Sequence, residues 1–551
     1  MANKFFTLVL HSHIPYVLSH GSWPHGMDWL YEASAESYLP LLRVCMRLRD
    51  EGIRPCLNIS FTPVLMEQLG SPGFGRTFKQ YLEARIACAR QDRACFEKTG
   101  AEVPGALAAY WEKWYEDVLE FFADGCREDI LAACRSLQDD GQVEVLTSAA
   151  THGYLPLLAK DDSVRWQVRQ GALAYEKYFG RRPPGFWLPE CGYRPGYPWR
   201  APLGNGEEVD RAGLDEILEQ ERVGCFFVDG HFLQGGGASS VYCDRFPALK
   251  DLWDKFRDAC RPVEGAARSP YEAYLARPSG IPFFVRDETS GAQVWSGKSG
   301  YPGDGWYLEF HKKRFPGGMR YWRVTASEAG LGDKQPYEPA AAGERLEANA
   351  SHFVEQLEKS LGPLPQGGVV AALYDTELFG HWWFEGPEWL YLVLKKLSVS
   401  GVRPATVSRC LEALPPRQMV SLPEGSWGEG GFHWIWLNDD TSWIWEKIYR
   451  IEEEAVALAN RSFPGKTRVL KQFVREKFLL ESSDWPFLIS TGSARDYAAH
   501  RAEEHFDRAW ALRNWLVRPE PLGLDEGRLL DVWDQEDGIF SEVVTPDGNI
   551  I

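Results

Sequence analysis

The chain of 551 residues lacks any apolar run approaching the roughly 20 residues that a membrane-spanning helix needs. Near the N-terminus, an apolar run over residues 5–10 stops at two histidines, and no small-residue cleavage site of a secretory signal follows it. The eleven cysteines form no CxxC pair and are odd in number, which opposes both a four-thiolate zinc site and a disulfide framework. We therefore expect a cytoplasmic protein in a reducing compartment.

Phosphate-binding and serine-nucleophile motifs are also missing. The sequence contains no GxGxxG, no GxxxxGK followed by Ser or Thr, and no GxSxG, which opposes nucleotide-dependent chemistry and serine hydrolysis. Positive charge is scarce, because 60 Lys and Arg face 78 Asp and Glu for a net charge of −18. This balance opposes binding to nucleic acid or to an anionic membrane.

Tryptophan, in contrast, is abundant, with 23 residues in a chain that is 44% hydrophobic and 25% charged. The overall composition is that of a globular protein, and the length allows two to four domains. Much of the tryptophan should pack the core. The excess suits ligands with apolar faces and polar edges, above all sugars.

Short apolar runs alternate with helical patterns over the first 400 residues or so. The alternation predicts a parallel β/α architecture with function at the carboxyl ends of the strands. The expected strands are residues 5–10, 56–61, 143–147, 185–188, 225–228, 282–285 and 369–373. The expected helices are residues 31–49, 77–95, 163–178, 207–222, 343–360 and 387–400.

The pattern changes near residue 415, after which three helical patterns follow with few strand signals. These patterns cover residues 441–460, 467–482 and 494–517. We expect a catalytic barrel over residues 1–415 and a helical domain over 416–551. An irregular region within the barrel, about 196–278, should form an inserted loop or helical subdomain, with a glycine run at 235–237 and a helix at 248–260.

Two carboxylates follow expected strands directly. Glu190 comes after 185–188, and Asp375, with Glu377 close behind, comes after 369–373. Either acid alone could be a loop or helix cap. Together they suit retaining glycoside chemistry, in which a nucleophile and a general acid/base stand about 5–5.5 Å apart.

Histidines mark the same strand ends. His11 and His13 follow the first strand, His152 follows 143–147, and His381 lies six residues beyond Asp375. An HxH pair with later His and Asp residues is one way in which barrel hydrolases hold zinc. Imidazoles can equally bind sugar hydroxyls, so the histidines leave both interpretations open.

Five tryptophans crowd one stretch of nineteen residues: Trp427, Trp434, Trp436, Trp443 and Trp445. One member of each closely spaced pair should pack a domain junction. Trp427 lies between Ser426 and Gly428 in a glycine-rich loop, and we predict that it is an exposed platform on which a sugar stacks.

Four stretches in order, HSHIPYVLSHG (11–21), EVLTSAATHGYLPLL (144–158), GFWLPECGYRP (185–195) and ALYDTELFGHWWFEGPEWL (372–390), resemble the signature regions of glycoside hydrolase family 57. More narrowly they resemble its 1,4-α-glucan branching enzymes. Residues 285–304, the SWGEGG stretch and SSDWPFLISTG (482–492) agree with that subgroup. The resemblance spans most of the chain.

The resemblance implies an α/β fold: a distorted (β/α)7 barrel with a small helical insertion and a C-terminal α-helical domain. It implies that Glu190 is the nucleophile and Asp375 the general acid/base of a double displacement that needs no cofactor and no metal. The chain would cleave an α-1,4 linkage and transfer the released chain to a 6-hydroxyl. The implied substrate-binding residues are Arg286, Gly303, Trp427, Asp484, His11, His13, His152, Trp295, His381 and Trp436.

The implied partner is an α-glucan such as amylose or a glycogen-like polysaccharide, bound by a monomer or homodimer. A tyrosine in a loop within 231–274 should screen water, with Tyr242, Tyr271 and Tyr274 as candidates. Gly192 departs from the alanine common there. The alternatives are an α-amylase or 4-α-glucanotransferase on the same scaffold and, with less support, a metal-dependent barrel hydrolase or an inactive glycan-binding protein.

Overall fold

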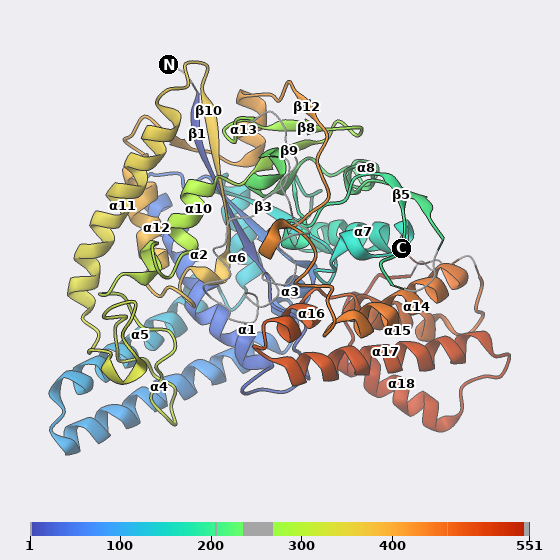
Figure 1. Ribbon diagram of the computed structural model, residues 1–551. Helices are drawn as coiled ribbons and strands as arrows, with labels where there is room; N and C mark the ends of the chain where they lie inside the picture. Colours follow the sequence, from blue (N-terminus) through green and yellow to red (C-terminus); the bar gives the residue numbers. More distant parts are fainter. Residues whose placement is uncertain (1–2, 204–206, 235–267, 460, 545–549, 551) are drawn as a thin grey trace.

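A curled parallel sheet forms the centre of the computed structural model, which describes residues 3–203, 207–234, 268–459, 461–544 and 550 (Figure 1). Seven of its strands run parallel in the spatial order β10-β1-β2-β3-β4-β7-β9. In chain order they are β1 (Lys4–Ser12), β2 (Leu57–Phe61), β3 (Val143–Ser148), β4 (Phe186–Trp187), β7 (Phe226–Val228), β9 (Pro282–Val285) and β10 (Gly368–Asp375). Each coincides with one of the seven runs predicted from the sequence.

The two ends of this series meet through the residue that follows β9. Arg286 forms a parallel bridge with Ala371 of β10, and the backbone N–H of Asp287 donates to the Ala371 carbonyl at 2.9 Å. The sheet therefore closes into the distorted (β/α)7 barrel that was expected. Two short strands, β8 (Tyr274–Ala276) and β12 (Met419–Val420), extend it beyond β9, and β11 (Arg403–Pro404) pairs with β1.

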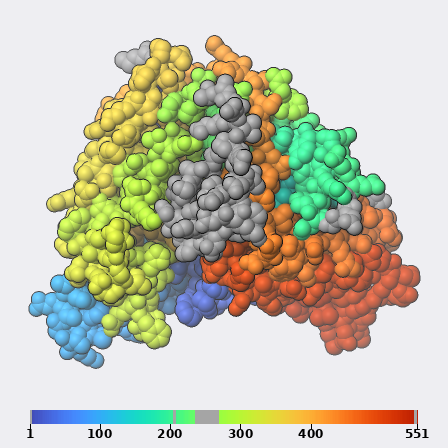
Figure 2. Space-filling model, viewed as in Figure 1, coloured from blue at the N-terminus to red at the C-terminus, as the bar shows by residue number. Residues whose placement is uncertain are grey.

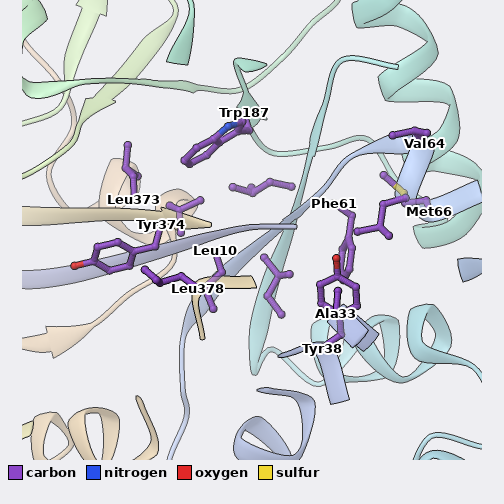
Figure 3. Close-up of a cluster of buried hydrophobic side chains, with 14 of the residues drawn as sticks. Leu10, Ala33, Tyr38, Phe61, Val64, Met66, Trp187, Leu373, Tyr374 and Leu378 are labelled. Carbon is purple, nitrogen blue, oxygen red and sulfur yellow. The ribbon is translucent and has the colours of Figure 1, made fainter. Parts of the chain in front are cut away.

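Burial on both faces explains the continuous apolar runs of the strands. Val9 and Leu10 of β1 are fully buried, as are Leu373 and Tyr374 of β10 and Trp187 of β4. Leu10, Leu373, Tyr374 and Trp187 belong to one buried cluster (Figure 3). Strands covered on both faces have no polar face to alternate with.

Helices cover the outside of the barrel. They are α1 (Met27–Ala33), α2 (Leu39–Asp50), α3 (Pro63–Leu69), α4 (Phe74–Thr99), α5 (Glu102–Glu120), α6 (Ile130–Asp139), α7 (Asp161–Phe179), α8 (Leu214–Gln220), α10 (Glu288–Trp295), α11 (Pro339–Leu361), α12 (Gly386–Leu397) and α13 (Val407–Ala413). The pair α4 and α5 projects at the lower left of Figure 1. No described helix is long and apolar enough to cross a membrane.

The stretch 196–278 differs from the expected insertion in two ways. The predicted helix over 207–222 is only α8, because its first part forms β6 (Val209–Arg211), which pairs with β5 (Tyr197–Trp199). The extended backbone of Gly213 separates β6 from α8. The stretch also holds β7, a strand of the barrel itself, so it is not wholly an insertion. The helix predicted at 248–260 and Tyr242 lie outside the described residues.

The C-terminal region is helical, as predicted. It comprises α14 (Ser442–Ala459), α15 (Thr467–Leu480), α16 (Asp484–Ser490), α17 (Arg495–Val517) and α18 (Leu524–Glu536). In the space-filling view these orange-to-red helices abut the N-terminal segment in blue (Figure 2). Tyr16 donates to the Glu536 carbonyl at 2.9 Å, and Arg501 donates to the Tyr16 carbonyl at 2.7 Å.

Candidate functional site

Glu190 stands immediately beyond β4, in a short turn with unusual backbone geometry. Its φ is 59°, and that of Cys191 is 47°, the left-handed region that costs non-glycine residues about 1–3 kcal/mol and clusters at functional sites. Two groups from distant parts of the chain reach its carboxylate. The indole N–H of Trp427 donates to Oε2 at 2.8 Å, and the hydroxyl of Ser483 lies 3.3 Å from Oε1.

Burial raises the pKa of Glu190 to about 7. The hydrogen bond from Trp427 lowers this pKa, whereas the negative charges of Asp375 and Asp484 raise it further. A carboxyl that is half ionised near neutrality can serve as a base, an acid or a nucleophile.

Asp375 is the last residue of β10 and lies beside His11 in the register of β1 and β10. Its charge contributes to the raised pKa of Glu190 and of Tyr38, so the two predicted carboxyls face the same end of the barrel. Glu377 turns inward and accepts hydrogen bonds from the backbone N–H of His13 at 3.1 Å and from Tyr38 at 2.5 Å. Burial raises the pKa of Glu377 to about 7.

Three of the four predicted histidines come together at this end. The Nε2 atoms of His11 and His152 lie 3.0 Å apart, and the rings of His13 and His152 stack with centroids 4.0 Å apart. His13 Nε2 approaches Asp484 at 2.9 Å. Burial lowers the pKa of His11 and of His152 well below the usual value, which keeps both rings neutral at pH 7.

His381 belongs to a different cluster. Its Nδ1 lies 2.8 Å from Glu36 Oε2, and Arg320 lies 3.1 Å from the other oxygen of that carboxylate. Its ring meets the edge of Trp382, which is 37% exposed. His381 is therefore held by a buried ion pair rather than by the other predicted histidines.

A metal-like grouping exists elsewhere in the described part of the chain. Glu476, His505 and Asp537 bring their ligand atoms within 4.8 Å of one another in the helical region. Arg508 pairs with Asp537, and His20 approaches the same carboxylate at 2.7 Å. The Arg508 guanidinium therefore already lies beside these acids. In the barrel, the ring nitrogens of the three predicted histidines also have protein partners. His11 Nδ1 contacts Ser60, and His152 Nδ1 contacts Ser483. His13 Nδ1 contacts Thr62, and its Nε2 contacts Asp484.

Trp427 is not the exposed platform that was predicted. Only 7% of it is exposed, because its backbone N–H donates to the Glu190 carbonyl at 3.0 Å and its ring packs edge-on against Trp187 and Trp295. The guanidinium of Arg286, which pairs with Asp229, lies 5.6 Å from the Trp427 ring centroid. Trp427 thus presents its N–H to Glu190 instead of its face to solvent.

Trp436 and Gly303 hold local structure. Trp436 is 1% exposed and stacks on Tyr154 with ring centroids 4.3 Å apart. Trp445, whose N–H donates to the Trp436 carbonyl, is equally buried, as predicted for one member of each tryptophan pair. Gly303 lies in a tight turn where a Cβ would fall 2.1 Å from the Gly297 carbonyl oxygen.

The two candidate loop tyrosines within the described residues lie in or beside strands of the sheet. Tyr274 lies in β8, is 1% exposed, and donates to the Ser269 carbonyl at 2.7 Å. Tyr271 is partly buried, and its carbonyl accepts from the Val369 N–H at the start of β10. Both belong to the barrel wall.

Sequence reasoning missed Ser483. Its hydroxyl lies 2.8 Å from His152 Nδ1 as well as near Glu190, and its backbone N–H donates to the His152 carbonyl at 3.1 Å. The available signal was the SSDWPFLISTG stretch, in which Asp484 was singled out and the hydroxyl beside it was not.

Known proteins resemble the chain in both of its parts. A model described as glycosyl hydrolase family 57 matches residues 7–423, and one described as 1,4-alpha-glucan branching enzyme, C-terminal, matches residues 447–545. A 1,4-alpha-glucan branching enzyme of Thermococcus kodakarensis is 42% identical over 549 residues, which cover 98% of this chain and 78% of that protein.

Solved structures agree. The crystal structure of a family 57 branching enzyme from Thermococcus kodakaraensis has a TM-score of 0.89 at 39% identity and covers 100% of this chain and 98% of that chain. The family 57-type branching enzyme of Pyrococcus horikoshii has a TM-score of 0.86 at 40% identity, with coverage of 98% and 95%. The α-amylase AmyC of Thermotoga maritima has a TM-score of 0.79 at 29% identity, with 98% of both chains covered. The chain therefore belongs to glycosyl hydrolase family 57.

Proposed function

We propose that the protein is a 1,4-α-glucan branching enzyme that works by retaining double displacement. One observation carries the proposal. Two residues of the region that matches the branching-enzyme C-terminal model contact predicted site residues of the barrel: the Ser483 hydroxyl lies within hydrogen-bond distance of the Glu190 carboxylate, and Asp484 lies within hydrogen-bond distance of His13. The helical region thus contributes side chains to the site at the barrel's carboxyl end.

In the proposed first step, the Glu190 carboxylate attacks the anomeric carbon of an α-1,4-linked glucose. The bond to the leaving 4-oxygen breaks, and Asp375 gives that oxygen its proton. In the second step, the Asp375 carboxylate takes the proton of an acceptor 6-hydroxyl, whose oxygen attacks the same carbon and expels Glu190. Two inversions give net retention, and neither step changes an oxidation state.

We assign substrate contact to groups at the rim of this site. Arg286, Trp295, Trp427 and Asp484 surround Glu190 or its neighbours, and His11, His13 and His152 form the adjoining wall. Trp436, Gly303 and His381 would act by shaping the walls.

An α-amylase is the second candidate, because AmyC shares the fold along 98% of both chains. The two reactions differ only in whether water or a sugar hydroxyl attacks the glycosyl-enzyme. The acceptor wins where the site binds it and screens out water.

We further propose a catalytic part over residues 1–415 and a helical part over 416–551, in line with the two matched ranges. The cysteine pattern favours action in the cytoplasm on a glycogen-like polysaccharide, as a step in glycogen synthesis. The net charge of −18 opposes a nucleic-acid partner. A monomer or homodimer is expected, and sedimentation would distinguish them.

The decisive experiment incubates the purified protein with amylose in EDTA. Proton NMR counts new α-1,6 linkages, and a reducing-end assay counts hydrolysis. Branches well in excess of reducing ends are the expected result. Reducing ends without branches would make the protein an amylase, and silence in EDTA with recovery on adding zinc would favour a metal-dependent hydrolase.

A further inference from the structure

A chain of hydrogen bonds runs from the barrel interior to Glu190. Ser60 Oγ lies 3.2 Å from His11 Nδ1, and His11 Nε2 lies 3.0 Å from His152 Nε2. Ser483 Oγ completes the chain at 2.8 Å from His152 Nδ1 and 3.3 Å from Glu190 Oε1. Every member is buried except Glu190, whose side chain is 14% exposed.

Proton counting leaves this chain only two arrangements. Burial lowers the pKa of His11 and His152, so each ring carries a single N–H and each hydroxyl a single O–H. If Ser483 donates to Glu190, it accepts from His152 Nδ1, and His152 Nε2 must accept from His11 Nε2. If Ser483 donates to His152 instead, every bond reverses, and Glu190 must be the donor.

The first arrangement fits an ionised Glu190, and the second fits a protonated one. In the first, Oε1 receives the Ser483 hydroxyl while Oε2 receives the Trp427 indole N–H. In the second, a protonated Oε1 donates to Ser483, and Ser60 at the far end turns its hydroxyl toward the Thr147 carbonyl, 3.4 Å away.

We infer that Ser483 is a positioning residue that couples the ionisation of Glu190 to the tautomers of His152 and His11. The inference rests on the proposed function, since it assumes that ionised Glu190 is the nucleophile. A residue of the helical region would thereby help to hold the barrel's nucleophile in its reactive state. The backbone N–H of Ser483 also donates to the His152 carbonyl. The same residue therefore holds the backbone of His152 and bridges its ring to Glu190.

Other titratable groups also face Glu190 and affect its ionisation. Asp375 from β10 and Asp484 from α16 oppose its ionisation, and His13 beyond β1 favours it. His152, beyond β3, approaches to 3.9 Å. Removing the Ser483 hydroxyl leaves all four side chains in place, so a change in ionisation would report the hydroxyl itself.

The test compares the pH profiles of kcat/KM on amylose for the unaltered protein, Ser483→Ala and Ser483→Thr. A charge-assisted hydrogen bond favours the ionised form, so Ser483→Ala should move the acidic limb upward by about one pH unit. That is about a tenfold loss below the limb, and the loss should be smaller above it. Ser483→Thr keeps the hydroxyl and should restore the original limb.

Ser490→Ala is the matched control. Ser490 is a buried serine at the end of α16, whereas Ser483 directly precedes that helix, and the Ser490 hydroxyl donates to the Ile435 carbonyl at 2.6 Å. Its loss should lower the melting temperature without moving the acidic limb. An unchanged limb in Ser483→Ala, or an equal loss at every pH, would overturn the inference.

A second measurement needs no variant. In ¹⁵N-histidine-labelled protein, His152 should carry its proton on Nδ1 and His11 on Nε2 above the limb, and both should switch below it. Tautomers that stay constant across the limb would overturn the coupling.

An assay of Glu190→Gln in parallel separates failure of this inference from failure of the proposed function. An active Glu190→Gln would overturn the proposed function. An inactive Glu190→Gln together with an unmoved Ser483→Ala limb would overturn only this inference.

Discussion

At the scale of single residues, the site depends on how Glu190 is held. A left-handed turn places its carboxyl beyond β4, and two donors from the second half of the chain meet its two oxygens. Backbone strain of this kind persists only where surrounding contacts hold it. The backbone N–H of Trp427, which donates to the Glu190 carbonyl, is one such contact.

Replacing Glu190 by Gln should abolish turnover while nearly preserving glucan binding. The amide keeps the shape of the side chain and loses the negative charge that the proposed attack on the anomeric carbon requires. Rate assays on amylose, paired with calorimetric titration of a maltooligosaccharide, check both halves. Turnover within about tenfold of the unaltered protein would contradict the role of Glu190.

The activity should rise with pH through about 7, because burial raises the pKa of Glu190 to about 7 and only the ionised form is nucleophilic. The indole N–H of Trp427, which donates to Oε2, lowers this pKa. Trp427→Phe removes that donor, so the pKa of Glu190 should rise and the acidic limb should move to higher pH. The kcat/KM profile from pH 5 to 9 measures it. Trp443→Phe is the control, since the Trp443 N–H donates to the Asp440 carbonyl instead; a limb that shifts equally in both variants would contradict the assignment.

At the scale of elements, the sequence pattern located the barrel well. The seven apolar runs correspond to the seven parallel strands, because strands buried on both faces leave an apolar signature in the sequence. The pattern was less informative where elements are short. Residues 207–222 read as one helix, although a hairpin strand and α8 share them, since helical and extended segments of a few residues have overlapping composition.

The contact between α7 and β3 offers a test at this scale. A Cβ on Gly171 of α7 would lie 2.1 Å from the Ser148 carbonyl oxygen at the end of β3. Gly171→Ala should therefore destabilise the protein by about 1–3 kcal/mol as the helix is pushed outward. Urea denaturation measures the loss.

Gly343→Ala is the matched control on α11, where nothing lies within 4 Å of the added Cβ. This change should stabilise the protein slightly, by about 0.5–1 kcal/mol, because alanine favours the helix interior. Equal effects of the two substitutions would show that the α7 contact does not constrain the barrel.

At the scale of the whole molecule, a buried network of acids, histidines and one arginine joins the N-terminal segment to the helical region. His20 approaches Asp537 at 2.7 Å, Arg508 pairs with the same carboxylate, and His505 approaches Glu476 at 2.7 Å. Burial opposes the charge of Asp537, but the hydrogen bond from His20 and the nearby His505 and Arg508 hold its pKa below the usual range. The network helps to fix the helical region against the barrel.

Asp537→Asn should destabilise the protein by about 1–3 kcal/mol, because a buried carboxylate that accepts from His20 and Arg508 loses its charge while Glu504 and Glu536 still pair with Arg508. The depressed pKa of Asp537 means that its contribution is present above about pH 4 and is lost as the pH falls below that. Thermal melts at pH 7 and pH 3 check the size and the pH dependence. Asp531→Asn, on an exposed pair with Arg468, should change stability by less than about 1 kcal/mol.

The sequence by itself determined the strands, most of the helices, the family and the positions of Glu190 and Asp375 at strand ends, because each follows from short-range pattern or from motifs contiguous in the chain. Only the tertiary structure decided that Trp427 is buried against Glu190, that His381 joins another cluster, and that Ser483 reaches the Glu190 carboxylate. These contacts join residues far apart in the sequence, such as His13 and Asp484, 471 positions apart. Local pattern carries no record of such pairings, since they follow from how barrel and helices pack.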